Sequence, residues 1–95
     1  MTISGAFMEE ISQALNVDRE TLIAQGIASL LKDRKRRLML ERLQRLAHYA
    51  LPSREALEQA VQAGKVAEHP AWEDVITLEN LEGEIARIDG YLSRL

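Results

Sequence analysis

The stretch LENLEGEIARIDGYLSRL (78–95) contains the most regular apolar pattern of the chain. Leucine or isoleucine stands at 78, 81, 85, 88, 92 and 95, so the spacing alternates between three and four residues. This spacing lines up the side chains along one side of a helix, as in the seam of a coiled coil. A helix this short is not stable alone, so its seam must pack on another surface. The pattern leaves open whether that surface belongs to the same chain or to a partner.

The composition of the whole chain favours an all-α protein of one domain. Its 95 residues are 46% hydrophobic but only 4% aromatic, so the core must consist of aliphatic side chains. The sequence contains no run of β-branched residues that would predict a strand. The absence of cysteine excludes disulfides and fits a reducing cytoplasm. Neither an apolar run of about 18 residues nor a signal-peptide layout is present, so we expect a cytoplasmic protein without membrane partners.

Upstream of the seam, the sequence predicts several more helices, giving four or five in total. A first helix spans 6–15, and a second begins after Asp18, a good N-cap, and continues to about residue 51 without proline. Ser53 caps a third helix over 54–63, and Gly64 suits its end. Pro70 suits the first position of another helical turn. The long central helix must bend or project, and an intertwined dimer would accommodate it.

The central segment carries two apolar stripes on nearly opposite sides of the helix. A turn rich in basic residues, 32–37, lies between the two stripes. It predicts two separate packing clusters, or a kink near residues 32–38. In the first stripe, a dimer contact or an N-terminal core is expected from Ile23, Ile27, Leu30 and Leu31, with Leu38 in line. The second stripe comprises Met39, Leu43, Leu46, Ala47 and Ala50.

Charge is distributed unevenly between the two halves of the chain. Residues 1–50 carry eight Lys/Arg and six Asp/Glu, whereas residues 51–95 carry four and nine. We therefore divide the chain into a helical dimerisation region (1–50), for which DNA binding is an open alternative, and an acidic helical partner-binding region (51–95). Uneven charge is also common on ordinary solvated helices, which is the alternative reading.

Two features stand out as candidate binding sites. The run KDRKRR (32–37) can pair with phosphates, an acidic protein or only solvent, and its nucleic-acid candidates are Lys32, Arg34, Lys35, Arg36 and Arg37. The only tryptophan, Trp72, lies in the acidic stretch HPAWED (69–74) just before the seam. Tryptophan is enriched at interface anchors, although Trp72 can equally join the last helix to the third one.

No constellation of catalytic residues is apparent, so we expect no enzyme activity. Cysteine is absent, and the two histidines, His48 and His69, have neither ligand spacing nor a nucleophile beside them. Adjacent acids such as Glu9 and Glu10 point about 100° apart on a helix and do not converge. The sequence therefore indicates no metal and no cofactor.

The C-terminal stretch QAVQAGKVAEHPAWEDVITLENLEGEIARIDGYLSRL (59–95) resembles small antitoxin-like proteins of bacterial and archaeal type II toxin–antitoxin systems. The matching positions are Gly64, Val66, Glu68, Trp72, Glu73 and Asp74. SQALNVDRETLIAQGIASLLKDRKRRL (12–38) is similar to the helix, turn and long helix of their N-terminal region. One departure is that only Thr2-Ile3-Ser4 precedes Gly5, which is too short for the strand with which ribbon-helix-helix antitoxins bind DNA.

The resemblance implies an antitoxin that binds and neutralises a cognate RNase-like toxin through its acidic C-terminal helices. The toxin-binding residues would be Trp72, Glu73, Asp74, Leu78, Leu81, Glu82, Ile85, Ile88 and Leu92, with Glu79 beside them. Self-association through the N-terminal region and autoregulatory DNA binding belong to the same expectation. The alternative function is a homo-oligomeric helical scaffold or assembly protein.

Overall fold

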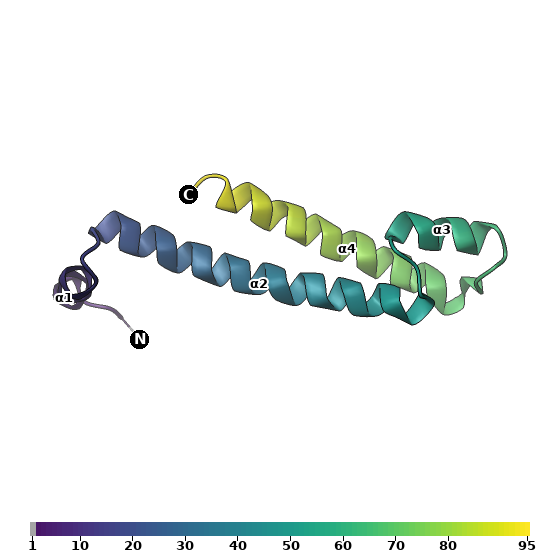
Figure 1. The fold of residues 1–95 in the computed structure, drawn as a ribbon, viewed down its shortest axis with the longest axis horizontal. Coiled ribbons are helices and arrows are strands. Elements are labelled where there is room, and N and C mark those ends of the chain that lie inside the picture. Colours follow the sequence, from purple (N-terminus) through teal and green to yellow (C-terminus); the bar gives the residue numbers. More distant parts are fainter. Residues whose placement is uncertain (1) are drawn as a thin grey trace.

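The computed structural model describes residues 2–95, and these residues form helices joined by short turns, with no strand among them. The all-α prediction is confirmed. The helices are α1 (Gly5–Leu15), α2 (Arg19–Tyr49), α3 (Arg54–Gln62) and α4 (Glu68–Leu92). The molecule measures 62 × 25 × 17 Å and its radius of gyration is 19.8 Å. A compact chain of this length would have a radius of about 12 Å, so the fold is strongly elongated (Figure 1).

Short polar side chains define where the helices begin. The Asp18 carboxylate accepts a hydrogen bond from the Thr21 backbone N–H at 2.6 Å, and the Ser53 hydroxyl accepts one from the Ala56 N–H at 3.1 Å. These bonds satisfy backbone donors that the first turn of a helix leaves free. Between α1 and α2 the chain turns at Asn16, whose φ is 56°. Asparagine tolerates this left-handed conformation better than most residues.

The start of α4 is irregular at His69, whose φ of −106° and ψ of 126° are extended rather than helical. Regular helix therefore begins at Pro70. Proline fits this position because the first turn needs no backbone N–H from it and its fixed φ is already helical.

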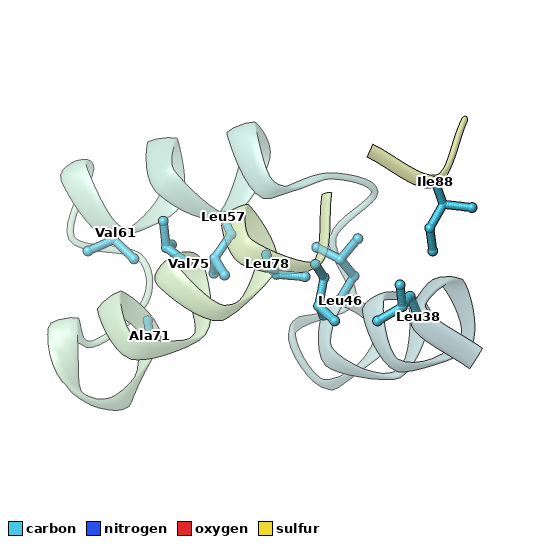
Figure 2. Close-up of a cluster of buried hydrophobic side chains, with 9 residues drawn as sticks. Leu38, Leu46, Leu57, Val61, Ala71, Val75, Leu78 and Ile88 are labelled. Carbon is cyan, nitrogen blue, oxygen red and sulfur yellow. The ribbon is translucent and has the colours of Figure 1, made fainter. Parts of the chain in front are cut away.

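α2 and α4 run antiparallel and side by side, and α3 packs against the end of α4 that lies near the α2–α3 turn (Figure 1). We call residues 31–92 the hairpin. Its core is one cluster of buried aliphatic side chains drawn from three helices, which converge between α2, α3 and α4 (Figure 2). The cluster consists of Leu38, Leu46, Leu57, Val61, Ala71, Val75, Leu78, Leu81 and Ile88.

The seam of the last helix therefore packs on the same chain, which decides between the two surfaces that the sequence left open. Leu78 and Leu57 are fully buried, and Ile85 and Leu92 pack against the cluster from its edge. The core also crosses the expected boundary between residues 50 and 51, because Leu46 and Leu57 belong to the same cluster.

The two predicted packing clusters along α2 are not observed. α2 is helical at every position from Arg19 to Tyr49, and its buried residues, Leu38 and Leu46, both face the single core. These two residues are only about 80° apart around the helix, so one neighbour covers both. Met39 and Leu43 point to the flank of the hairpin and remain exposed.

The N-terminal part of the chain has almost no core of its own. We call residues 2–30 the arm; it comprises α1 and the first twelve residues of α2. Among the described helices, α1 contacts only α2, and it lies crosswise at the end of the molecule far from α3 (Figure 1). The one buried residue of the arm is Ser12.

Candidate interaction surfaces

A network of ion pairs stabilises the middle of the hairpin. Glu82 on α4 accepts hydrogen bonds from Arg42 of α2 at 3.0 Å and from Arg54 of α3 at 2.9 Å. Arg54 also donates to Glu58 at 2.8 Å. Burial alone would raise the pKa of Glu82, but the two guanidinium groups outweigh it and hold the pKa below its ordinary value. The same carboxylates raise the pKa of Arg54. Glu82 thus connects α4 to both α2 and α3 through ion pairs.

Asp74, expected to face a basic partner, instead pairs with α2 of its own chain. Its carboxylate accepts hydrogen bonds from Arg45 at 3.0 Å and from the Tyr49 hydroxyl. Burial, together with the hydrogen bond to Asp74, raises the pKa of Tyr49 to about 12. The sequence carried one signal for this contact, since Arg45 and Tyr49 are four residues apart and share a helix face.

Three side chains of the expected toxin-binding set are buried in the hairpin, and two more pair with arginines of the same chain. Leu78, Leu81 and Ile88 are in the core, where α2 and α3 cover them, so they form no surface that a partner can reach in this conformation. Glu82 and Asp74 are likewise occupied by arginines of α2 and α3. All five residues are thus engaged within their own chain. The physical reason is that α2 supplies in cis both the apolar face and the basic groups that α4 requires.

Two members of that set, Trp72 and Glu73, remain accessible at the end of the hairpin near α3. Trp72 is 37% exposed, and its neighbour Ile76, one turn further along α4, is 57% exposed. Glu73 is exposed beside them, with one carboxylate oxygen 3.0 Å from Nδ1 of His69. Trp72 is thus not one of the buried core residues. Trp72, Glu73 and Ile76 form a small apolar and acidic patch, which we call the tip patch.

The basic run of α2 lies beside acidic residues of α4. Arg34 is 3.3 Å from Glu84, and Lys35 is 2.6 Å from Asp89. Arg36 and Arg37 both pair with Asp33 of the same run, yet their side chains are 77% and 70% exposed. Lys32 is also exposed and has no ion pair among residues 2–95. Because these pairs are exposed, each contributes little to stability, and the run stays available to an external anion.

The expected dimerisation residues mostly face solvent. Ile23 and Ile27 are exposed, Leu30 is 74% exposed, and only Leu31 turns toward the hairpin core. Tyr91, in the last turn of α4, and Leu95, just beyond it, add to this side of the molecule. An open groove of about 310 Å³ lies here between α2 and α4, lined by Ile27, Leu31, Tyr91, Arg94 and Leu95.

A second and larger groove, which the sequence reading missed, follows another side of the α2–α4 pair. Its volume is about 710 Å³, and Met39, Leu43 and Ile85 contribute apolar side chains to it. The ion pairs Lys35–Asp89 and Arg42–Glu82 flank it. The apolar spacing of 39 and 43 was visible in the sequence, but it was interpreted as a packed face.

A family model matches the chain over residues 1–95. The chain belongs to the Uncharacterized protein MJ0235 family. No curated protein and no solved structure matches it. The description of the family states no activity, so functional inference for this family member rests on its surfaces.

Two further findings concern metal ligands and membrane-spanning helices among the described residues. Residues 2–95 contain no group of three or more His, Asp or Glu side chains placed to hold a metal ion. None of the helices over the same residues combines the length and the apolar character that crossing a bilayer requires. The two grooves, the tip patch and the basic run are candidate interaction surfaces of this chain.

Proposed function

We propose that this chain is a homo-oligomeric helical assembly protein that self-associates through its arm. The observation that carries the proposal is the contrast within the arm between one buried side chain and many exposed apolar ones. The large apolar side chains that the arm exposes are Ile3, Phe7, Leu15, Ile23, Ile27 and Leu30.

The exposed apolar area is close to what a stable interface buries. The six side chains together expose roughly 600 Å² per chain, compared with about 800 Å² per partner in an interface of standard size. The accessible surface of the whole chain is 7031 Å² for 10.7 kDa, whereas a compact monomer of that mass would have about 5500 Å². Exposed apolar area of this extent is typical of interaction sites on natural proteins where it is contiguous, as it is along α2 at Ile23, Ile27 and Leu30, which share one side of the helix.

Helix energetics support the same proposal. α1 has 11 residues, and isolated helices shorter than about 12–15 residues are marginal in water. The twelve arm residues of α2 extend the helix about 18 Å beyond the hairpin core. A second chain packed on the arm would supply the tertiary contacts that this segment lacks, and it would also account for the absence of a core there.

The proposal is tested by the oligomeric state and by one charge placed on the arm. We expect the purified chain to sediment as an oligomer at micromolar concentration, and Leu30→Glu to shift it to monomer. Burying two leucines across an interface contributes about 3–6 kcal/mol. The dissociation constant of Leu30→Glu should therefore be at least about 100-fold higher than that of the wild type. The matched control is Leu43→Glu, because Leu43 is similarly exposed, at 61%, on a different face of the same helix.

A monomeric wild-type chain at about 100 μM would eliminate self-association as the function. Equal dissociation of both variants would show that the contact is not confined to the arm. Circular dichroism of each variant checks that the hairpin remains folded, since neither substituted leucine belongs to its core.

The tip patch favours a second candidate function, the antitoxin-like binding of a cognate toxin. Trp72 and Ile76 form an exposed aromatic–aliphatic pair one helical turn apart, with Glu73 adjacent. Such a pair suits a partner with an apolar pocket and a basic rim. Because the seam of α4 is occupied in cis, the toxin would contact the tip patch rather than the seam.

Co-expression with the product of the neighbouring gene tests this second candidate. We expect the two proteins to co-purify, and Trp72→Ala to weaken the complex at least about 10-fold, as expected for an interface anchor. Gln62→Ala serves as the control, because Gln62 is an exposed residue at the end of α3. Failure of the wild-type pair to co-purify would exclude the antitoxin role and leave the assembly role untouched.

A further inference from the structure

Charged residues in the first 37 positions of the chain form two consecutive blocks of opposite sign. Residues 1–31 contain four Asp/Glu (Glu9, Glu10, Asp18 and Glu20) and one Arg (Arg19), for a net charge of −3. Residues 32–37 contain five Lys/Arg and one Asp, for a net charge of +4. An acidic arm is thus followed directly by the basic run, with the exposed residues Ile23, Ile27 and Leu30 lying between their charged ends.

One charged residue of each block lies on the same face of α2 as these apolar residues. At about 100° per residue, Glu20, Ile23, Ile27, Leu30 and Arg34 fall within a sector roughly 80° wide. Ile27 lies at the midpoint, seven residues from Glu20 and seven from Arg34. The face is therefore self-complementary under a two-fold rotation about Ile27. A parallel pairing would instead place Glu20 opposite Glu20 and Arg34 opposite Arg34.

The hairpin leaves the N-terminal part of this face exposed at Ile23, Ile27 and Leu30. Further along α2, α4 packs close to the same side, because Leu31 and Leu38 contact the core and Arg34 lies 3.3 Å from Glu84. Tyr91 and Leu95 form the wall of the adjoining groove next to Ile27. A second α2 placed antiparallel along the face would contact α2 and the end of α4 together, and two such hairpins would form a four-helix arrangement over this part of the molecule.

The contacts of the basic run within the chain do not compete strongly with such a partner. The Arg34–Glu84 pair is largely exposed on both sides, and Arg36 and Arg37 share a single Asp33. Exposed pairs of this kind contribute little and exchange readily. The run thus carries more basic charge than its own chain neutralises.

We propose that the ligand of the basic run is the acidic arm of a second copy of this chain, bound antiparallel about Ile27. The inference rests on the proposed self-association and adds its geometry. An isologous contact of this kind uses the same surface twice and closes on itself as a dimer. At each end of the interface, an acidic residue of one chain then lies beside a basic residue of the other. The apolar residues of the two arms face one another in the middle.

Engineered disulfides test the direction of pairing, since the natural chain contains no cysteine. Ile27→Cys should cross-link to itself across the axis. Ile23→Cys and Leu30→Cys, mixed in equal amounts with a size tag on one, should form mainly the mixed disulfide. In an antiparallel dimer two copies of Ile23→Cys are about 12 Å apart along the axis, beyond the reach of a disulfide. Self-linked Ile23→Cys and Leu30→Cys without the mixed product would indicate parallel pairing and overturn the proposal.

Charge reversal tests the role of the run. Glu20→Arg and Arg34→Glu should each raise the dimer dissociation constant about 3- to 10-fold, because two symmetric pairs are lost. The double variant Glu20→Arg/Arg34→Glu should return to within about 2-fold of wild type, since acid and base are merely exchanged. Additive loss in the double variant would contradict the proposal.

The same variants separate the possible failures. A monomeric wild-type chain removes both this inference and the proposed function. If the chain is a dimer whose dissociation constant does not change on charge reversal, and if Ile27→Cys forms no cross-link, only the antiparallel geometry is ruled out. If a 20-base-pair DNA duplex binds with affinity that falls steeply with salt and is lost in Arg36→Glu/Arg37→Glu, while those changes leave the dimer intact, the ligand of the run is nucleic acid and the proposal is wrong.

Discussion

The hairpin and the arm have similar apolar contents but opposite relations to solvent. In the hairpin, aliphatic residues from α2, α3 and α4 form one core with Leu57 and Leu78 fully buried. In the arm, leucines and isoleucines of the same kind remain exposed, and Ser12 alone is buried. The difference teaches that the hairpin has a core on which it can fold as a unit, whereas the proposed self-association would supply the contacts that the arm lacks within its own chain.

The largest effect should come from emptying the hairpin core. Leu78→Ala removes a fully buried side chain, and we expect the free energy of unfolding to fall by about 2–5 kcal/mol. Urea titration followed by fluorescence of Trp72, which lies on α4, measures the hairpin directly. Leu30→Ala is the arm counterpart, and it should leave this transition unchanged under conditions where the chain is monomeric. A comparable loss in both variants would show that arm and hairpin form one cooperative unit.

A smaller effect is expected from the ion pairs around Glu82. Glu82→Gln should lower the free energy of unfolding by about 1–3 kcal/mol at pH 7, because it weakens hydrogen bonds to two arginines. The more exposed Glu84→Gln should change it by no more than about 0.5 kcal/mol.

The pH dependence of the same site has a defined sign. The pKa of Glu82 is lower in the folded chain than its ordinary value near 4.5. The ionised carboxylate therefore stabilises the hairpin above that pH, and this stabilisation is lost as the pH falls through the folded pKa. Urea titrations between pH 7 and pH 3 should show a smaller loss of stability in Glu82→Gln than in wild type. Parallel curves would mean that Glu82 does not carry this pH dependence.

Removing a helix cap should separate the two regions again. Ser53→Ala deletes the hydroxyl that accepts the Ala56 N–H, and we expect the hairpin to lose about 0.5–2 kcal/mol. Asp18→Ala deletes the corresponding cap of α2 within the arm. Amide hydrogen exchange should then quicken in the first turns of α2 but not in α4. Faster exchange throughout the chain in Asp18→Ala would argue against an independent arm.

The smallest effect concerns two glycines inside helices. Neither Gly26 nor Gly83 has a neighbouring atom within 4 Å of where a Cβ would stand, so alanine fits at both. Gly83→Ala should raise the unfolding free energy of the hairpin by about 0.4–1 kcal/mol. Gly26→Ala should slow hydrogen exchange in the arm without moving the hairpin transition. A destabilised Gly83→Ala would reveal a contact at that face that the isolated chain does not show.

Several features could be predicted from the sequence because they depend on local chemistry. The aliphatic composition gave the all-α class, Asp18 and Ser53 indicated two helix starts, and the 78–95 spacing marked a buried seam. Exposed positions were harder to assign. Met39 and Leu43 have the spacing of a packed face but line an open groove, because a stripe records which residues share a side and not what covers it.

The sequence by itself determined where helices form and which face of each is apolar, since both follow from backbone geometry and from residues three or four apart. Only the tertiary structure decided that α4 packs on its own α2, that Asp74 and Glu82 pair with arginines of the same chain, and that the arm stays uncovered. These outcomes depend on contacts between residues distant in the chain. The directions of the turns decide which helices can pack together. The free energy of burying all their apolar faces at once then selects the arrangement.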